Sequence, residues 1–143
     1  MENKEYKLAR QVLNLANQIT KNRNRHLKEL NITAEQADSL LFFCSDENKT
    51  ISDLKDYLNI SHQTARGIVK RLEEKKLLEL SVSETDGRYK IVLLTEKGNY
   101  IVSCLKRNGT HTGYRLLSGM TKTEQEQFAA SIGKALKNVM EEY

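Results

Sequence analysis

The stretch that decides the fold is TISDLKDYLNISHQTARGIVKRLEEKKLLELSVSETDGRYKIVLLTEKG, residues 50–98. Apolar residues recur at spacings of three and four over residues 51–58, and this period predicts a short amphipathic helix. Asn59-Ile60-Ser61 predicts a turn, because asparagine tolerates a left-handed backbone and a serine hydroxyl can cap the next helix. A second helix is expected from about Ser61 to Lys75, so that two helices joined by a tight turn occupy about residues 52–75. The buried stripe of this second helix is expected to consist of Ala65, Ile68, Val69 and Leu72.

A β-hairpin is predicted directly after the second helix. Leu78, Leu80 and Val82 alternate with polar residues, which is typical of a half-buried strand. Residues 90–94 supply a return strand, and Asp86-Gly87 between the two strands is a turn signal. Helix, turn, helix and hairpin in this order predict a mainly α fold with a small β-hairpin wing over about residues 78–94, which is a winged helix-turn-helix.

The polar face of the second helix carries groups that suit DNA. Amides and guanidiniums can pair in two places with adenine or guanine edges in the major groove. The small residues Ala65 and Gly67 would let the backbone approach another surface closely. The alternative is a solvated face on an ordinary amphipathic helix, but the neighbouring helix, turn and hairpin together favour DNA. The expected contacts are Ser61 and His62 at the helix entrance, followed by Gln63, Thr64, Arg66 and Lys70.

The hairpin tip is expected to add basic contacts. Arg88 and Lys90 lie at or near the tip, and an arginine there can enter the minor groove, where the negative potential attracts it. Asp86 lies two residues before Arg88, so its carboxylate can hold the guanidinium in one pose. The alternative is a plain surface hairpin with one stray arginine.

Two short motifs in and after the hairpin indicate a family. Asp86-Gly87-Arg88, followed by Leu94-Thr95-Glu96-Lys97-Gly98, resembles the D-x-R wing and the L-T-x-x-G strand-to-helix junction of the MarR family of transcription regulators. Residues 51–75 resemble the helix-turn-helix of that family, and residues 31–36 resemble the entry to its second helix. The resemblance extends over the whole chain and implies a single MarR-type domain, residues 1–143.

The chain departs from the family pattern at two positions. Lys76 stands where the family often has a glycine that ends the recognition helix, so this helix is expected either to run on or to end differently. Ser81 stands where a basic residue is common, which suggests fewer phosphate contacts from the first wing strand.

The flanks of the winged region predict long helices with apolar stripes. One helix is expected over about residues 4–30, and another over about residues 121–143. Thr33 with Gln36, and Thr121 with Glu124, are capping-box patterns that mark helix starts. A further helix is expected from about Glu96 to about Leu117, although Gly109 and Gly113 weaken it.

The two long terminal helices are expected to make a homodimer. Apolar stripes far from a small winged core need a partner surface, and a two-fold pair is the economical answer. The alternative is a monomer whose helices fold back on their own core. The resemblance implies intertwined first and last helices from two subunits. A dimer would read a pseudo-palindromic operator in double-stranded DNA, with half-sites about 10–10.5 base pairs apart.

The whole-chain composition suits a nucleic-acid partner. The 143 residues carry a formal net charge of +4, and a positive balance favours nucleic acid without proving it. No apolar run approaches the roughly 20 residues needed to span a bilayer, so no membrane partner is expected. The polar start MENKEYK shows no signal peptide, so a cytoplasmic location is expected.

The sequence shows no convincing catalytic or cofactor motif. No phosphate-cradling glycine loop occurs, and Ser61 and His62 are a poor nucleophile–base pair because adjacent helical residues do not face each other. No enzyme activity and no cofactor are therefore expected. Cys44 lies in an apolar run that favours a buried, inert thiol, and the histidines show no close metal-ligand spacing.

A small-molecule effector is a further expectation from the resemblance. Family members often have an effector cavity beside the winged lobe, but no cluster of polar groups here identifies a ligand. The expected function is a dimeric, DNA-binding repressor modulated by such an effector. The alternatives are a winged protein-interaction module without sequence-specific DNA binding, or a regulator that responds to redox state or metal. The expected cavity wall, which could equally be plain core, is Arg23, His26, Phe42, Phe43, Tyr100 and Cys104.

Overall fold

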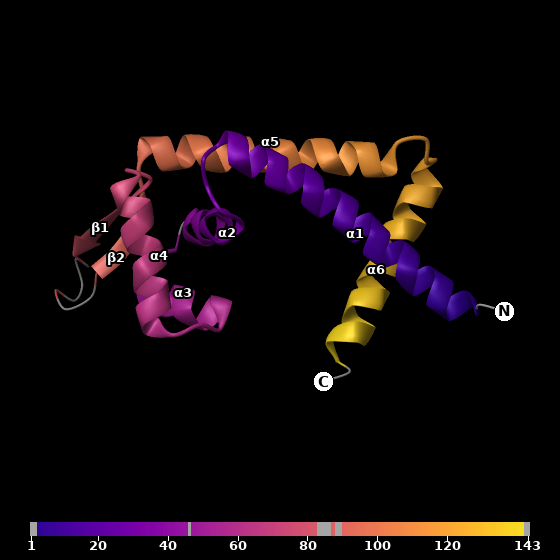
Figure 1. The fold of residues 1–143 in the computed structure, drawn as a ribbon, viewed down its shortest axis with the longest axis horizontal. Coiled ribbons are helices and arrows are strands. Elements are labelled where there is room, and N and C mark those ends of the chain that lie inside the picture. Colours follow the sequence, from indigo (N-terminus) through magenta and orange to yellow (C-terminus); the bar gives the residue numbers. More distant parts are fainter. Residues whose placement is uncertain (1–2, 46, 83–86, 88–89, 142–143) are drawn as a thin grey trace. The chain divides into compact units, whose positions relative to one another are not determined.

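The computed structural model describes residues 3–45, 47–82, 87 and 90–141. The chain divides into two compact units, Met1–Asn108 and Gly109–Tyr143. The elements, in chain order, are α1 (Lys4–Glu29), α2 (Ala34–Phe43), α3 (Ile51–Leu58), α4 (His62–Glu74), β1 (Leu78–Val82), β2 (Lys90–Leu94), α5 (Glu96–Leu117) and α6 (Lys122–Met140) (Figure 1). The fold is mainly helical with one small hairpin, as predicted.

Threonine capping boxes start three of the helices. The Oγ1 of Thr33 accepts a hydrogen bond from the Gln36 N–H at 3.1 Å, while the Thr33 N–H donates to the Gln36 side chain at 3.2 Å. Thr121 and Glu124 make the same reciprocal pair before α6. Both capping boxes are confirmed, and each satisfies two backbone donors that a bare helix start would leave unpaired. Thr50 and Asp53 form a third box before α3, which was not predicted from the sequence.

The turn between α3 and α4 is confirmed in its conformation. Asn59 has φ 55°, in the left-handed region, and the Ile60 N–H donates to the Lys55 carbonyl at 3.1 Å. Ser61 is the N-cap of α4, and its Oγ accepts a hydrogen bond from the Thr64 N–H at 3.1 Å. The turn residues therefore end one helix and begin the next, which fixes the direction of α4.

Lys76 takes the place of a helix-ending glycine. It has φ 63°, and its N–H donates to the Glu73 carbonyl at 2.8 Å, while the Leu77 N–H donates to the Leu72 carbonyl at 2.9 Å. This pair of bonds is a Schellman motif, with Leu72 and Leu77 both buried beside it. α4 thus ends at the family position without glycine and does not run on.

The wing is a two-stranded antiparallel sheet. β1 and β2 pair in a register that sets Leu80 against Val92. Val92 is buried, and its N–H also donates to the Lys49 carbonyl at 2.8 Å, which attaches the segment before α3 to the sheet. Val82 is 56% exposed, so the apolar face of β1 is less buried toward the hairpin tip.

One apolar core holds the unit that contains α4. Gly98 lies where α5 begins, and a Cβ atom there would collide with the carbonyl oxygen of Leu77. The glycine of the L-T-x-x-G junction therefore allows the start of α5 to lie directly against the start of β1. The buried apolar residues of the core are Leu27, Ile32, Ala37, Leu40, Phe43, Leu54, Ala65, Ile68, Val69, Leu72, Leu77, Leu78, Val92, Ile101 and Val102.

The terminal helices keep much of their apolar surface exposed. On α1 only Leu27 is buried, and no described residue of α6 is buried. Within the described ranges, no helix is long and apolar enough to cross a bilayer. The large exposed apolar residues of these two helices include Leu8, Val12, Leu13, Leu15, Ile132, Leu136, Val139 and Met140.

Candidate nucleic-acid interface

Most of the polar face of α4 is presented to solvent. All six residues expected to contact DNA on this helix are exposed, whereas the opposite stripe is buried in the core. Among the described residues, no hydrogen bond or ion pair engages the side chains of Gln63, Arg66 or Lys70. Their amide and cationic groups remain available to an external partner. The six residues are Ser61, His62, Gln63, Thr64, Arg66 and Lys70.

The entrance of α4 is partly organised within the chain. The hydroxyls of Ser61 and Thr64 lie 2.8 Å apart, and Ser61 also caps the helix. These two side chains therefore shape the first turn. The helix N-terminus adds partial positive charge from its backbone N–H groups, which suits a phosphate.

A lysine at the other end of α4 anchors the helix to the turn between α1 and α2. The Nζ of Lys75 donates to the Asn31 carbonyl at 2.7 Å and to the Gln36 side-chain oxygen at 2.9 Å. Gln36 is buried and belongs to the capping box of α2. Lys97 near the start of α5 donates to the Lys75 carbonyl at 3.4 Å. Lys75 was not predicted as an anchor, because its partners lie 44 and 39 residues away in the sequence.

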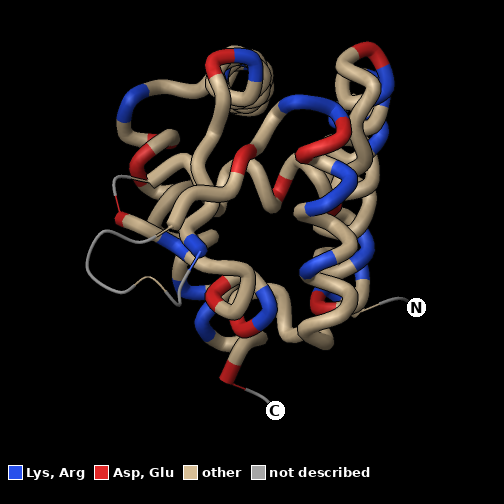
Figure 2. The backbone as a smooth tube through the Cα atoms, turned by 90° about the vertical axis from the view of Figure 1, so that its left-hand side faces the viewer, with Lys and Arg blue, Asp and Glu red and all other residues tan. Residues whose placement is uncertain are grey.

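The wing contributes one described member of the expected set. Lys90 is exposed at the start of β2, where it pairs with Val82. Gly87, the glycine of the turn signal, is also exposed. Asp86 and Arg88 lie outside the described residues. Lysines and arginines recur along the described backbone (Figure 2), so positive charge is not confined to α4.

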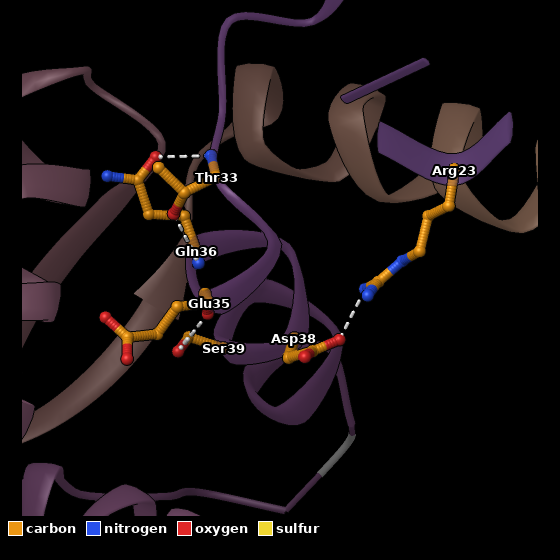
Figure 3. A network of polar contacts seen from close by, with 6 residues as sticks. All are labelled: Arg23, Thr33, Glu35, Gln36, Asp38 and Ser39. Carbon is orange, nitrogen blue, oxygen red and sulfur yellow. Dashed lines mark hydrogen bonds and ion pairs between the residues drawn. The ribbon is translucent and has the colours of Figure 1, made fainter. Parts of the chain in front are cut away.

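An ion pair joins α1 to α2. The guanidinium of Arg23 on α1 contacts the carboxylate of Asp38 on α2 at 2.5 Å (Figure 3). Within α2, the Ser39 hydroxyl is buried and donates to the Glu35 carbonyl at 2.8 Å. The nearby Nε2 of His26 is buried and has no hydrogen-bond partner among the described residues. Arg23 is thus engaged within the chain.

Of the expected effector wall, Phe43 lines the hollow described beside the sheet. Phe42 stacks on Tyr57, with ring centroids 4.6 Å apart, and the Lys49 ammonium lies 4.1 Å from the Phe42 centroid. Tyr100 is 62% exposed. A hollow of about 360 Å³ lies beside the sheet, but Phe43 is the single residue of the expected wall that lines it. The hollow is lined by Phe43, Cys44, Ser45, Glu47, Asn48, Glu79, Val92, Leu93, Leu94 and Asn99.

The two cysteines are free and partly exposed. The prediction that Cys44 is buried is wrong: it caps the C-terminus of α2, at the edge of the core, and its thiol donates to the Leu41 carbonyl at 3.0 Å. The sulfur of Cys104 accepts a hydrogen bond from the Arg107 guanidinium at 3.7 Å. Across the described ranges, no three histidine, cysteine or acidic side chains gather as a metal site.

Comparison with known proteins shows similarity to the MarR family and to bacterial transcriptional regulators. The model of the MarR family matches residues 30–88, from the turn before α2 into the wing. The transcriptional repressor MprA of Escherichia coli (strain K12) is 28% identical over 137 residues, which are 94% of this chain and 78% of MprA. The uncharacterized HTH-type transcriptional regulator YybA of Bacillus subtilis is 27% identical over 116 residues, covering 81% of this chain and 77% of YybA.

A solved complex with DNA has the same fold. The crystal structure of the S. aureus MepR–DNA complex superimposes with a TM-score of 0.73 at 25% identity, covering 87% of this chain and 93% of MepR. The two helices, the tight turn, the hairpin and the exposed polar face of α4 define a winged helix-turn-helix protein. Over residues 30–88 the sequence matches the MarR family, and most of the chain is similar to transcription regulators such as MprA.

Proposed function

We propose that this chain regulates transcription by sequence-specific binding of double-stranded DNA, with α4 in the major groove. The observation that carries the proposal is the exposed row of Gln63, Arg66 and Lys70, whose side chains have no partner in the described part of the chain, on a helix whose other face is buried. Such groups suit base edges and phosphates. The wing would follow the adjacent minor groove. The proposed DNA contacts are Ser61, His62, Gln63, Thr64, Arg66, Lys70, Asp86, Arg88 and Lys90.

The functional form is a homodimer in this proposal. The apolar stripes of α1 and α6 are exposed on the single chain, with Leu8 at 57% and Leu136 at 58%. Surfaces of this kind are stabilised by pairing with a second copy. The whole chain would act as one MarR-type unit in the cytoplasm, where it meets DNA, and its site would be a pseudo-palindrome.

The dimer acts as a repressor that blocks promoter access, and a small effector weakens its DNA binding. Support comes from the curated relative MprA, which is a transcriptional repressor. The chain works by binding alone, without catalysis. An effector must bind the DNA-free form more tightly than the DNA-bound form, because only a difference in affinity shifts the equilibrium.

Selection from a random double-stranded DNA pool, followed by titration of the recovered site at two salt concentrations, tests the proposal. We expect a palindrome with half-sites about one helical turn apart and an affinity that falls steeply with salt. Recovery of no motif, with weak binding to every duplex, would overturn sequence-specific binding and favour a protein-interaction role.

A further inference from the structure

Gly67 lies in the middle of the polar face of α4, where a long side chain would be expected. The buried stripe of α4 consists of Ala65, Ile68, Val69 and Leu72. At 3.6 residues per turn, Gly67 falls nearly opposite the centre of that stripe. Gln63 and Lys70 are its neighbours along the outer face, one turn before and one turn after. The helix therefore has a gap in its row of exposed side chains.

Nothing within the described chain requires glycine at this position. A Cβ atom added at Gly67 would meet nothing within 4 Å, the backbone of its own helix aside. Its backbone is helical and φ is not positive, unlike Gly119 with φ 83°. Gly98 is different again, because a Cβ there would collide with Leu77. Since glycine is among the least favourable residues in a helix interior, Gly67 weakens α4 without any packing benefit.

The side chains around the gap have the chemistry of a nucleic-acid contact. Gln63 and Thr64 lie one turn before Gly67, and Lys70 and Arg71 lie one turn after it. All four are exposed. A protein partner would call for apolar or aromatic anchors beside such a gap, and none of these four residues provides one.

We propose that Gly67 is a specificity-determining position of the DNA site, where the edge of a base pair packs directly against the backbone of α4. This inference rests on the proposed function. Without a side chain at this point the helix lies deeper in the groove, and the flanking Gln63 and Lys70 reach their partners. A single methyl group would hold the helix away from the bases and lengthen the contacts of its neighbours.

The test compares Gly67→Ala with Gly133→Ala in the full-length protein. Gly133 is an exposed glycine inside α6, and an added Cβ there also meets nothing within 4 Å. Both substitutions should raise the melting temperature by about 2–4 °C, because alanine is the better helix former. Gly67→Ala should also weaken binding to the selected site by about tenfold or more, which is the loss of one base contact. Binding to unrelated duplex should change by less than about threefold, since phosphates dominate it. Gly133→Ala should leave both affinities unchanged.

A repeat of the DNA selection with Gly67→Ala separates specificity from stability. We expect the preferred base to change or be lost at one base pair in each half-site, with the other positions retained. Unchanged affinity and an unchanged selected sequence would overturn the inference while leaving the proposed function intact. If the unmodified protein itself selects no sequence, the proposed function fails first and the role of Gly67 falls with it.

Discussion

α4 and α6 are both amphipathic helices, yet their exposed surfaces differ in chemistry. α4 buries its apolar stripe within its own chain and presents amides and cations to solvent. α6 buries no described residue, and its exposed face includes Leu136, Val139 and Met140. The packing of α4 is therefore complete within its own chain, and its exposed face can contact a charged ligand. The packing of α6 is incomplete, and its apolar face is suited to contact with another protein.

The largest effect should come from truncating the buried side of α4. Leu72 has no exposed surface, so Leu72→Ala should lower the free energy of unfolding by about 2–5 kcal/mol. Leu136→Ala makes the same change on α6, where the side chain is 58% exposed. Urea denaturation at low and high protein concentration should show a loss for Leu72→Ala at both. A loss for Leu136→Ala should depend on concentration, because it acts through a second chain. Equal losses for the two variants at every concentration would contradict the comparison.

The polar side of α4 should matter for DNA and not for folding. Arg66→Ala should weaken binding to the selected site by about 1–3 kcal/mol and relax the preference at one base pair. Lys134→Ala removes a cation from the exposed surface of α6 and serves as the control. Fluorescence titration of labelled DNA measures both. If the two variants weaken binding equally, the effect reflects net charge alone and the assignment of the α4 face is wrong.

The anchor at the C-terminus of α4 should have an intermediate effect. Lys75→Met removes hydrogen bonds to Asn31 and Gln36 and leaves the oxygen of a buried amide with one partner fewer. The expected loss of folding stability is about 1–2 kcal/mol, reduced by the partial exposure of Lys75. Lys70→Met changes the same residue type on the open face, so denaturation should show little loss for it. A stability unchanged by Lys75→Met would mean that this anchor does not hold α4.

The smallest effect should be a gain in stability at the helix end. Lys76 is left-handed with φ 63°, so Lys76→Gly should raise the free energy of unfolding by about 1 kcal/mol. Asn59→Gly is the matched control, since asparagine already tolerates φ 55° and should gain less. Thermal unfolding monitored by circular dichroism measures both variants. A larger gain for Asn59→Gly would indicate that Lys76 is held without strain.

Most features that depend on neighbouring residues could be predicted from the sequence, although the equally local capping box of Thr50 and Asp53 was not. The capping boxes at Thr33 and Thr121 involve residues three apart, and the period of the apolar stripe shows which face of α4 is buried. The Asn59 turn likewise follows from a residue that adopts left-handed backbone easily. In each case the interacting atoms lie within about one turn of helix, so local composition determines the result.

Features that depend on the fold could not be predicted in this way. Lys75 meets Asn31 and Gln36 only because α4 ends beside the start of α2. The burial of Cys44 was wrongly predicted, because an apolar run does not show where the core stops. The end of α4 at Lys76 was left open, since one lysine fits either a continuing helix or a strained cap.

The exposure of α1 makes the folding of this helix depend on protein concentration in the cell. Residues 4–26 of this helix bury no side chain, because the buried residue of α1 is Leu27 near its end. The early part of the helix has little to pack against until a second copy is present, and isolated helices are marginal in water. The concentration of the protein would then determine whether the early part of α1 is ordered. A regulator of this design would lose its N-terminal order at low abundance, and dilution would act as a switch.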